Sequence, residues 1–276
     1  MDRIRLIASD MDATLLDEQS QLPADFEETI HALAELGIRF APASGRPLYT
    51  LEAMFPTLQD ELVFIGDNGG AIRWKGQNLF TSEMSPEGWR ALNRLTREQG
   101  DIAVLCGLES AYVERPFAVH DAVLRHFYTK IEYVDRLEDV TAPADKFTIY
   151  LPQHNAQRAY DTVYASQRSI YSVAVAGECW VDIMNPGVHK GAALQTLGQL
   201  WGLPSESIMA FGDTYNDAEM LQTVRYGFLM ENGSEPLRQK VPFLAPSHRE
   251  AGVMQVLHRV LAQNGCVCPE DFVPAH

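Results

Sequence analysis

Residues 4–15 read Ile4-Arg5-Leu6-Ile7-Ala8-Ser9-Asp10-Met11-Asp12-Ala13-Thr14-Leu15. The apolar run at 4–9 is typical of a strand buried on both faces of a parallel sheet. Asp10 and Asp12 follow where that strand ends, and in an open parallel sheet ligands bind at this carboxyl edge. Like charges crowded at the end of a buried strand are costly unless a cation offsets them. The stretch therefore indicates a metal site or an acid–base pair.

A helix and a second strand follow directly along the chain. Phe26, Ile30 and Leu33 recur at helical spacing, and Gly37 stands where a C-terminal helix cap belongs. The apolar stretch at 38–43 predicts the second strand. Strand, helix and strand in this order form a βαβ unit, which implies a parallel sheet with a right-handed crossover.

The pattern changes after Asp67-Asn68-Gly69-Gly70, which predicts a hairpin turn between strands at 62–65 and 71–74. From about residue 84 to 184 it is typical of an α+β domain. We expect helices at 86–99, 118–128 and 154–168, and strands at 102–106, 111–114, 146–151, 170–175 and 179–184. The βα alternation then resumes, with helices at 190–201, 216–223 and 249–263 and strands at 208–211 and 227–230.

The simplest account of these patterns is an α/β protein with a Rossmann-like parallel-sheet core, interrupted by an inserted α+β cap domain. The core would comprise residues 1–83 and 186–276, and the insertion residues 84–185. The tail after Gly265 is expected to be loosely attached.

Composition narrows the class of partner. The 276 residues include 22 Lys and Arg against 37 Asp and Glu, a formal net charge of −15, which argues against a nucleic-acid or anionic-membrane surface. The four cysteines are too few and scattered for a disulfide framework, and no apolar run reaches the roughly 18 residues of a membrane span. We therefore expect a cytoplasmic protein in which an anionic substrate would have to be met by a local positive site; its oligomeric state stays open.

Three further motifs lie at predicted strand–helix junctions. Asp213 and Asp217 repeat the paired-carboxylate pattern and could join Asp10 and Asp12 around Mg²⁺, which prefers oxygen ligands. Ser44-Gly45-Arg46 offers a hydroxyl, backbone N–H groups and a guanidinium suited to phosphate oxygens. Lys190 adds a point charge at a helix start. Each motif alone is weak, but together at one sheet edge they indicate a phosphate-processing site.

These motifs resemble motifs one to four of the haloacid dehalogenase superfamily. The residues that carry the resemblance are Asp10-Met11-Asp12-Ala13-Thr14-Leu15-Leu16, Ser44-Gly45-Arg46, Lys190-Gly191 and Gly212-Asp213-Thr214-Tyr215-Asn216-Asp217-Ala218-Glu219-Met220. An insertion between motifs two and three, and the Asn68-Gly69-Gly70 turn, resemble the Cof-type subgroup of sugar-phosphate phosphatases.

The resemblance implies a Mg²⁺-dependent hydrolase of small phosphate monoesters, with sugar phosphates or related metabolites as substrates. Asp10 would be the nucleophile that forms an aspartyl-phosphate, and Asp12 the general acid and base. The metal residues would be Asp10, Asp12 (through its backbone carbonyl), Asp213 and Asp217, with Asp217 binding a metal-bound water. The phosphoryl group would be held by Ser44, Gly45, Arg46, Lys190 and Asn216.

The sequence departs from the family pattern at Ala13, where the family usually has Gly. If the position needs a positive φ, Ala would cost on the order of 1 kcal/mol and could shift the loop that carries Asp12.

Two alternatives to a phosphatase stay open at this point: a phosphoryl transferase or mutase, and a non-catalytic binder of a phosphorylated metabolite. In the inserted domain, Trp180 is interpreted as core packing and Asp182 as solvated surface, so neither is assigned to the site.

Overall fold

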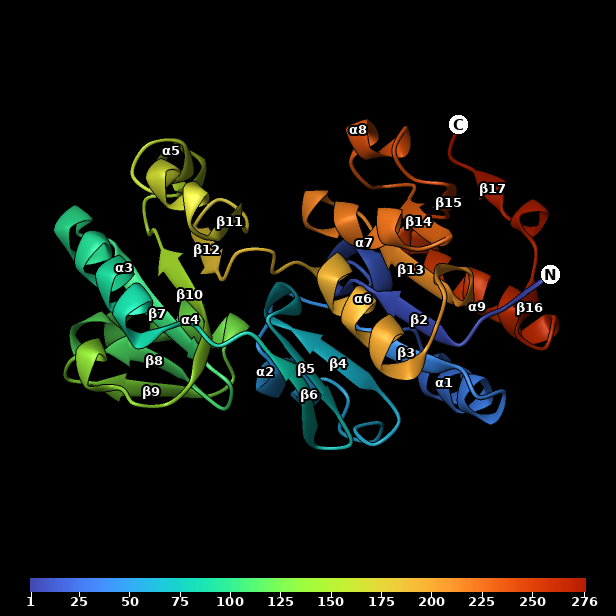
Figure 1. Cartoon of the computed structure of the whole chain (residues 1–276), viewed down its shortest axis with the longest axis horizontal. Coiled ribbons are helices and arrows are strands. Elements are labelled where there is room, and N and C mark those ends of the chain that lie inside the picture. Colours follow the sequence, from blue (N-terminus) through green and yellow to red (C-terminus); the bar gives the residue numbers. More distant parts are fainter.

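The chain folds around two separate six-stranded sheets. The computed structural model describes residues 1–276, and Figure 1 shows one sheet on the left, the other on the right and a small hairpin sheet between them. The right-hand sheet, here the parallel sheet, has the order β17-β15-β14-β13-β2-β3. Its strands are β2 (Leu6–Ser9), β3 (Arg39–Pro42), β13 (Ile208–Gly212), β14 (Tyr226–Met230), β15 (Phe243–Ala245) and β17 (Val273–Pro274).

All neighbouring strands of this sheet run parallel except the edge pair β15 and β17. Residues alternate between its two faces: Ile7 and Phe211 join one apolar cluster, whereas Leu6 and Ala210 join another. The first face is covered by α1 (Phe26–Glu35) and α9 (Gly252–Ala262), the second by α6 (Lys190–Trp201) and α7 (Ala218–Thr223). The short helix α8 (Glu235–Arg238) lies between β14 and β15 in the chain. The α/β class and the parallel sheet predicted from the sequence are thus confirmed.

The predicted hairpin turn is confirmed between β4 (Val63–Gly66) and β5 (Ala71–Trp74), which pair antiparallel. Asp67, Asn68 and Gly69 all have positive φ, at 50°, 55° and 98°. Two neighbouring elements were not predicted: α2 (Leu48–Ala53) and the third strand β6 (Gln77–Thr81). Both are short, and neither carries a strong apolar period.

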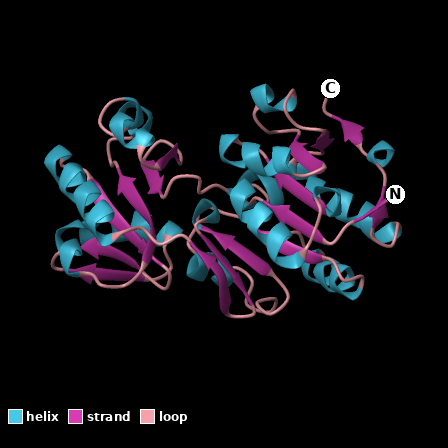
Figure 2. Cartoon of the chain, viewed as in Figure 1, coloured by secondary structure: helices cyan, strands magenta, loops and turns pink.

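The left-hand sheet, here the mixed sheet, has the order β11-β12-β10-β7-β8-β9 and is antiparallel except for the β8–β9 pair (Figure 2). Its strands are β7 (Ile102–Gly107), β8 (Ala111–Glu114), β9 (Ile131–Val134), β10 (Ala144–Tyr150), β11 (Ser172–Val175) and β12 (Trp180–Met184). Its helices are α3 (Pro86–Gln99), α4 (Asp121–Phe127) and α5 (Ala156–Asp161). Apart from the unpredicted β9, these elements match the expected α+β pattern, but the helix expected at 154–168 ends at Asp161, and only a 3₁₀ turn follows at Ala165–Ser169. The sheet has apolar clusters of its own.

The prediction of a loosely attached tail after Gly265 is wrong. Strand β16 (Cys266–Val267) pairs with β1 (Asp2–Arg3), and β17 completes the edge of the parallel sheet. Val267 and Phe272 are buried in the same cluster as α1 and α9. Two apolar side chains and short strand pairings hold the tail in place. So few residues give no sequence pattern that would distinguish an attached tail from an unattached one.

Candidate active site

Three carboxylates converge at the carboxyl edge of the parallel sheet. Asp10 follows β2 and Asp213 follows the neighbouring β13, and the Asp10 N–H donates to the Phe211 carbonyl at 3.0 Å. Asp217 comes from the helical turn that leads into α7. Single oxygens of these three aspartates all lie within 4.8 Å of one another, and all three residues are buried. The strand register therefore assembles residues far apart in the sequence.

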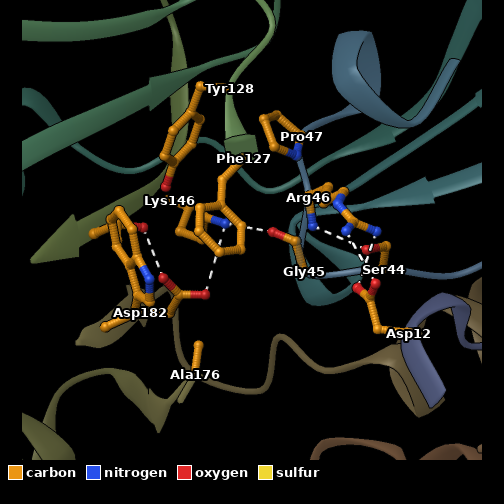
Figure 3. A pocket seen from close by; sticks show the side chains of 12 residues that line it. Asp12, Ser44, Gly45, Arg46, Pro47, Phe127, Tyr128, Lys146, Ala176 and Asp182 are labelled. Atoms are coloured by element: carbon orange, nitrogen blue, oxygen red, sulfur yellow. Dashed lines mark hydrogen bonds and ion pairs between the residues drawn. The ribbon is translucent and has the colours of Figure 1, made fainter. Parts of the chain in front are cut away.

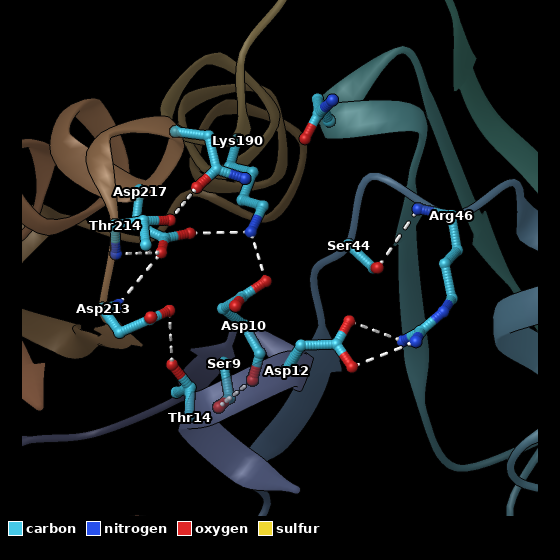
Figure 4. Close-up of polar contacts among 12 residues, drawn as sticks. Ser9, Asp10, Asp12, Thr14, Ser44, Arg46, Lys190, Asp213, Thr214 and Asp217 are labelled. Atoms are coloured by element: carbon cyan, nitrogen blue, oxygen red, sulfur yellow. Dashed lines mark hydrogen bonds and ion pairs between the residues drawn. The ribbon is translucent and has the colours of Figure 1, made fainter. Parts of the chain in front are cut away.

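Lys190 is the first residue of α6 and is fully buried against these carboxylates (Figure 4). His189 caps the helix by accepting from the Ala192 N–H at 3.1 Å. The Lys190 ammonium donates to Asp10 and, at 2.7 Å, to Asp217. The other oxygen of Asp217 accepts the N–H of Asp213 at 3.0 Å and that of Thr214 at 3.2 Å. Asp217 thus fixes both the lysine and the loop that carries Asp213.

The group carries more negative than positive charge. Burial, reinforced by Asp217, raises the pKa of Asp10 to about 8 and that of Asp213 to about 6, although Lys190 opposes both shifts. Burial alone would lower the pKa of Lys190, but Asp10 and Asp217 raise it, so the lysine stays charged. Two uncompensated carboxylates in a buried oxygen-rich site are what a hard divalent cation needs. The donor set therefore fits a metal such as Mg²⁺.

The Asp12 side chain lies outside this group. One of its oxygens accepts from the Arg46 guanidinium at 3.0 Å and the other lies 2.9 Å from it in an ion pair, a paired arrangement visible in Figure 4. Ser44, which is buried, accepts from the Arg46 backbone N–H at 3.1 Å. Of the four residues predicted to form the metal site, the structure brings together the side chains of Asp10, Asp213 and Asp217, and turns that of Asp12 toward the Ser44-Gly45-Arg46 motif, which is predicted to bind phosphate.

Two other expectations concern the loops around this edge. Ala13 has φ of +56°, so the position does adopt the left-handed conformation, and Asn232 holds its carbonyl at 2.8 Å. Asn216 is exposed and accepts from the Thr214 hydroxyl at 2.6 Å. It makes no hydrogen bond to Lys190, and its contact with a phosphoryl group stays a prediction.

The sequence matches the haloacid dehalogenase-like hydrolase family over residues 7–257. The chain belongs to this family. It is 31% identical, over 94% of its length and 96% of the relative's, to the Escherichia coli 5-amino-6-(5-phospho-D-ribitylamino)uracil phosphatase. It is 30% identical to the HMP-PP phosphatase of Cronobacter sakazakii, over 87% of this chain and 89% of that one.

Solved structures agree with this assignment. A Streptococcus mutans protein superposes with a TM-score of 0.85 at 28% identity, over 94% of this chain and 99% of that one. A haloacid dehalogenase-like hydrolase from Bacteroides thetaiotaomicron shares the fold at a TM-score of 0.81 and 22% identity, covering 94% of this chain and 100% of the other. The chain is therefore an enzyme of the phosphatase type. No helix combines the length and the apolar character needed to cross a membrane.

A cavity of about 180 Å³ lies in this phosphatase between the Ser44-Gly45-Arg46 motif and the mixed sheet (Figure 3). On one side it is bounded by Asp12 and residues 44–47. On the other it is lined by residues of the mixed sheet and its loops: Phe127, Tyr128, Lys146, Thr148, Ala176, Trp180 and Asp182.

Two predictions about this wall need revision. Asp182 is not solvated surface: it is 4% exposed and accepts from Thr148 at 2.7 Å and from Asn68 at 3.2 Å. Trp180 packs against Tyr150 as expected, with ring centroids 4.6 Å apart, but it also lines the cavity. Lys146 was missed, although a charged Asp145-Lys146 pair inside an otherwise apolar strand is a detectable signal.

Proposed function

We propose that this phosphatase is Mg²⁺-dependent and hydrolyses small phosphate monoesters through an aspartyl-phosphate on Asp10. The observation that carries the proposal is the convergence of Asp10, Asp213 and Asp217 on one point beside Lys190. Ser44 and the Asp12–Arg46 pair lie at the neighbouring strand end. Nucleophile, charge compensation and phosphate donors are thus available at one edge of the sheet.

In the first step an Asp10 carboxylate oxygen attacks phosphorus, and the bond from phosphorus to the leaving oxygen breaks. Asp12 donates a proton to that oxygen, so the leaving group departs as an alcohol. In the second step water attacks phosphorus and gives a proton to Asp12, and the bond from phosphorus to the Asp10 oxygen breaks. Orthophosphate is released and the Asp10 carboxylate is restored. A loose transition state leaves most of the catalysis to positioning and charge.

The metal would be held by the carboxylates of Asp10 and Asp213 and the backbone carbonyl of Asp12, with Asp217 orienting the loop. When bound, Mg²⁺ offsets the charge repulsion between a carboxylate nucleophile and a phosphate dianion. Lys190 would contribute the same kind of compensation, because its ammonium already contacts Asp10. Asp217 keeps that ammonium in place through its 2.7 Å contact.

Phosphoryl oxygens would be bound by Ser44, the backbone N–H groups around Gly45, Arg46 and Lys190, with Asn216 at the rim. The Arg46 guanidinium contacts both carboxylate oxygens of Asp12, and a phosphate group offers oxygens in a similar paired arrangement. Arrival of substrate would draw Arg46 from Asp12 to the phosphate, which frees the Asp12 carboxyl to exchange a proton.

We further propose that residues 84–185 act as a cap over this edge. The cavity between the mixed sheet and the phosphate-binding motif would hold the leaving group away from water. Its volume of about 180 Å³ suits a group with one small ring, since a cavity of about 150 Å³ holds benzene. Sugar phosphates and phosphoribitylaminouracil-type metabolites, one of which a relative's name specifies, are the first substrates to test. A cytoplasmic location stays a prediction.

The test is phosphate release from a panel of phosphomonoesters, with Mg²⁺ and with EDTA, for the parent and for Asp10→Asn. We expect turnover that requires the metal and falls at least about 1,000-fold in the variant, because the nucleophile is lost. Asp60→Asn, an exposed aspartate before β4, is the matched control and should keep parental activity.

Turnover that survives Asp10→Asn or EDTA would contradict the mechanism. Faster phosphate transfer to an added sugar alcohol than to water would instead favour a transferase. An aspartyl-phosphate captured on the parent, and absent from Asp10→Asn, would support the intermediate directly.

A further inference from the structure

A second buried lysine, Lys146 on β10, joins the mixed sheet to the phosphate-binding motif. Its side chain is 2% exposed. The ammonium donates to the Gly45 carbonyl at 2.6 Å and lies 2.9 Å from an Asp67 oxygen and 3.6 Å from an Asp182 oxygen. These partners come from three segments: the loop after β3, the turn between β4 and β5, and strand β12.

The lysine stays charged in this position. Burial alone would lower its pKa, but the carboxylates of Asp182 and Asp67 raise it well above the usual value. A buried ammonium is costly unless each of its donors finds a partner. Here the ammonium donates to one hydrogen-bond partner, the neutral Gly45 carbonyl, and forms ion pairs with the two carboxylates. The carbonyl adds direction to the contact without adding charge.

That carbonyl controls the orientation of one peptide group. The chain has no cis peptide bond, and in a trans peptide the C=O and the following N–H point in opposite directions. With the Gly45 carbonyl directed at Lys146, the Arg46 N–H points away from it and donates to Ser44 at 3.1 Å. If this peptide rotated, the carbonyl oxygen would face the phosphate side and repel phosphoryl oxygens.

We propose that Lys146 is a positioning residue of the phosphate site, which holds the Gly45–Arg46 peptide with its N–H on the side of Ser44 and its carbonyl on the side of the mixed sheet. This inference rests on the proposed function, because it assumes that the motif binds the phosphoryl group. It assigns to the mixed sheet a part in phosphate binding in addition to covering the edge.

The same lysine also connects the phosphate site to the cavity. Lys146 and Asp182 both line it, and Asp182 is in turn fixed by Asn68 and Thr148. A displaced mixed sheet would remove the ammonium from Gly45 together with one cavity wall. Phosphate binding and leaving-group binding are thereby coupled through one side chain.

Arg73 on β5 provides a matched control. It is also a buried cation, 7% exposed, and it also joins the hairpin sheet to the mixed sheet, with Glu52 at 3.1 Å and Glu109 at 2.5 Å. It makes no hydrogen bond to residues 44–46. If Lys146 only fastened the two parts together, Arg73→Met and Lys146→Met would have the same consequences.

The experiment compares these two variants with the parent in three measurements: the inhibition constant of orthophosphate, kcat/KM for acetyl phosphate, and the thermal midpoint. Acetyl phosphate has a small leaving group and reports on the phosphate site alone. We expect Lys146→Met to raise the inhibition constant of orthophosphate and to lower kcat/KM for acetyl phosphate by about tenfold or more. Arg73→Met should change both by less than about threefold at a comparable loss of thermal stability.

Equal kinetic effects of the two variants would overturn the proposal and leave Lys146 a purely structural link. An effect confined to larger esters, with acetyl phosphate and orthophosphate unchanged, would overturn it in favour of a leaving-group contact. If Lys146→Met does not fold, the double variant Lys146→Met with Asp67→Asn removes the nearer of the two carboxylates that lose their partner and should show the same kinetic loss. A parent without turnover would instead count against the proposed function.

Discussion

Two clusters of this protein have the same composition, three buried aspartates and one buried lysine. The edge cluster comprises Asp10, Asp213, Asp217 and Lys190; the junction cluster comprises Asp67, Asp145, Asp182 and Lys146. The edge cluster directs three oxygens at one point beside the phosphate-binding motif. The junction cluster spreads its carboxylates over the hairpin turn and two strands of the mixed sheet.

The clusters also differ in how their excess negative charge is compensated. In the junction cluster, burial and the neighbouring Asp67 raise the pKa of Asp145 well above its ordinary value, which favours its neutral form. Neither Asp145 oxygen has a hydrogen-bond partner otherwise. The edge cluster, with converging oxygens at open strand ends, is suited to compensation by a metal ion. Convergence and access, more than residue content, distinguish a reactive site from a structural one.

The largest expected contrast between the clusters is in the response to metal. Asp213→Asn should lower kcat/KM by about 100-fold or more, because it removes a charged metal ligand. It should also abolish the Mg²⁺-induced rise in thermal midpoint, which at saturation of about 100 Kd corresponds to about 2.7 kcal/mol in the parent. Asp145→Asn should preserve both responses. An undiminished Mg²⁺ shift in Asp213→Asn would place the metal elsewhere.

A smaller effect is expected for Asp145→Asn, which should raise the free energy of unfolding. The pKa of Asp145 is raised in the folded state, so the native state binds a proton that the unfolded state releases above its own pKa of about 4. The contribution of Asp145 to the free energy of unfolding therefore falls as pH rises above about 4. Asp145→Asn keeps the shape without the titration and should stabilise the fold by more than about 1 kcal/mol at pH 7. Urea unfolding at pH 7 and pH 4 measures this gain, which should shrink at pH 4; a destabilised variant at pH 7 would show that Asp145 is ionised.

The smallest expected effect concerns the loop of the edge cluster. Ala13 holds φ of +56°, so Ala13→Gly should relieve strain of up to about 1 kcal/mol, partly offset by the flexibility of glycine in the unfolded chain. Thermal unfolding together with kcat for the best phosphomonoester would show whether strain in this loop also limits catalysis. A loss of stability would mean that the contact from Asn232 already compensates for the strain.

Elements with strong end signals could be predicted closely from the sequence. α3 (Pro86–Gln99) has Ser85 as an N-cap that accepts from Gly88 at 3.1 Å, and Gly100 in the left-handed conformation at its end. α6 likewise ends before Gly202, also left-handed. The edge aspartates were predictable for a related reason: Asp10 and Asp213 each follow an apolar strand, and Asp217 lies four residues after Asp213, so neighbouring parallel strands place them at one edge.

The junction cluster could not be predicted in the same way. Asp67 lies in a turn, Asp182 is in the middle of a buried strand, and they meet Lys146 only through the packing of the hairpin sheet on the mixed sheet. No local pattern encodes such a meeting of segments 79 and 36 residues away from Lys146 along the chain. The orientation of Asp12 toward Arg46 could likewise not be predicted from the sequence, because it depends on side-chain rotation at the strand ends.

The pairing of β1 with β16 has a practical consequence for engineering. Asp2 lies opposite Val267, and Figure 1 shows both N and C on the side of the molecule away from the mixed sheet. A linker could therefore join residues 1 and 276, and the chain could be reopened at an exposed turn to give a circular permutant with its active site intact. Fusion partners attached at residue 1 or at residue 276 would both lie on the side of the molecule opposite the mixed sheet.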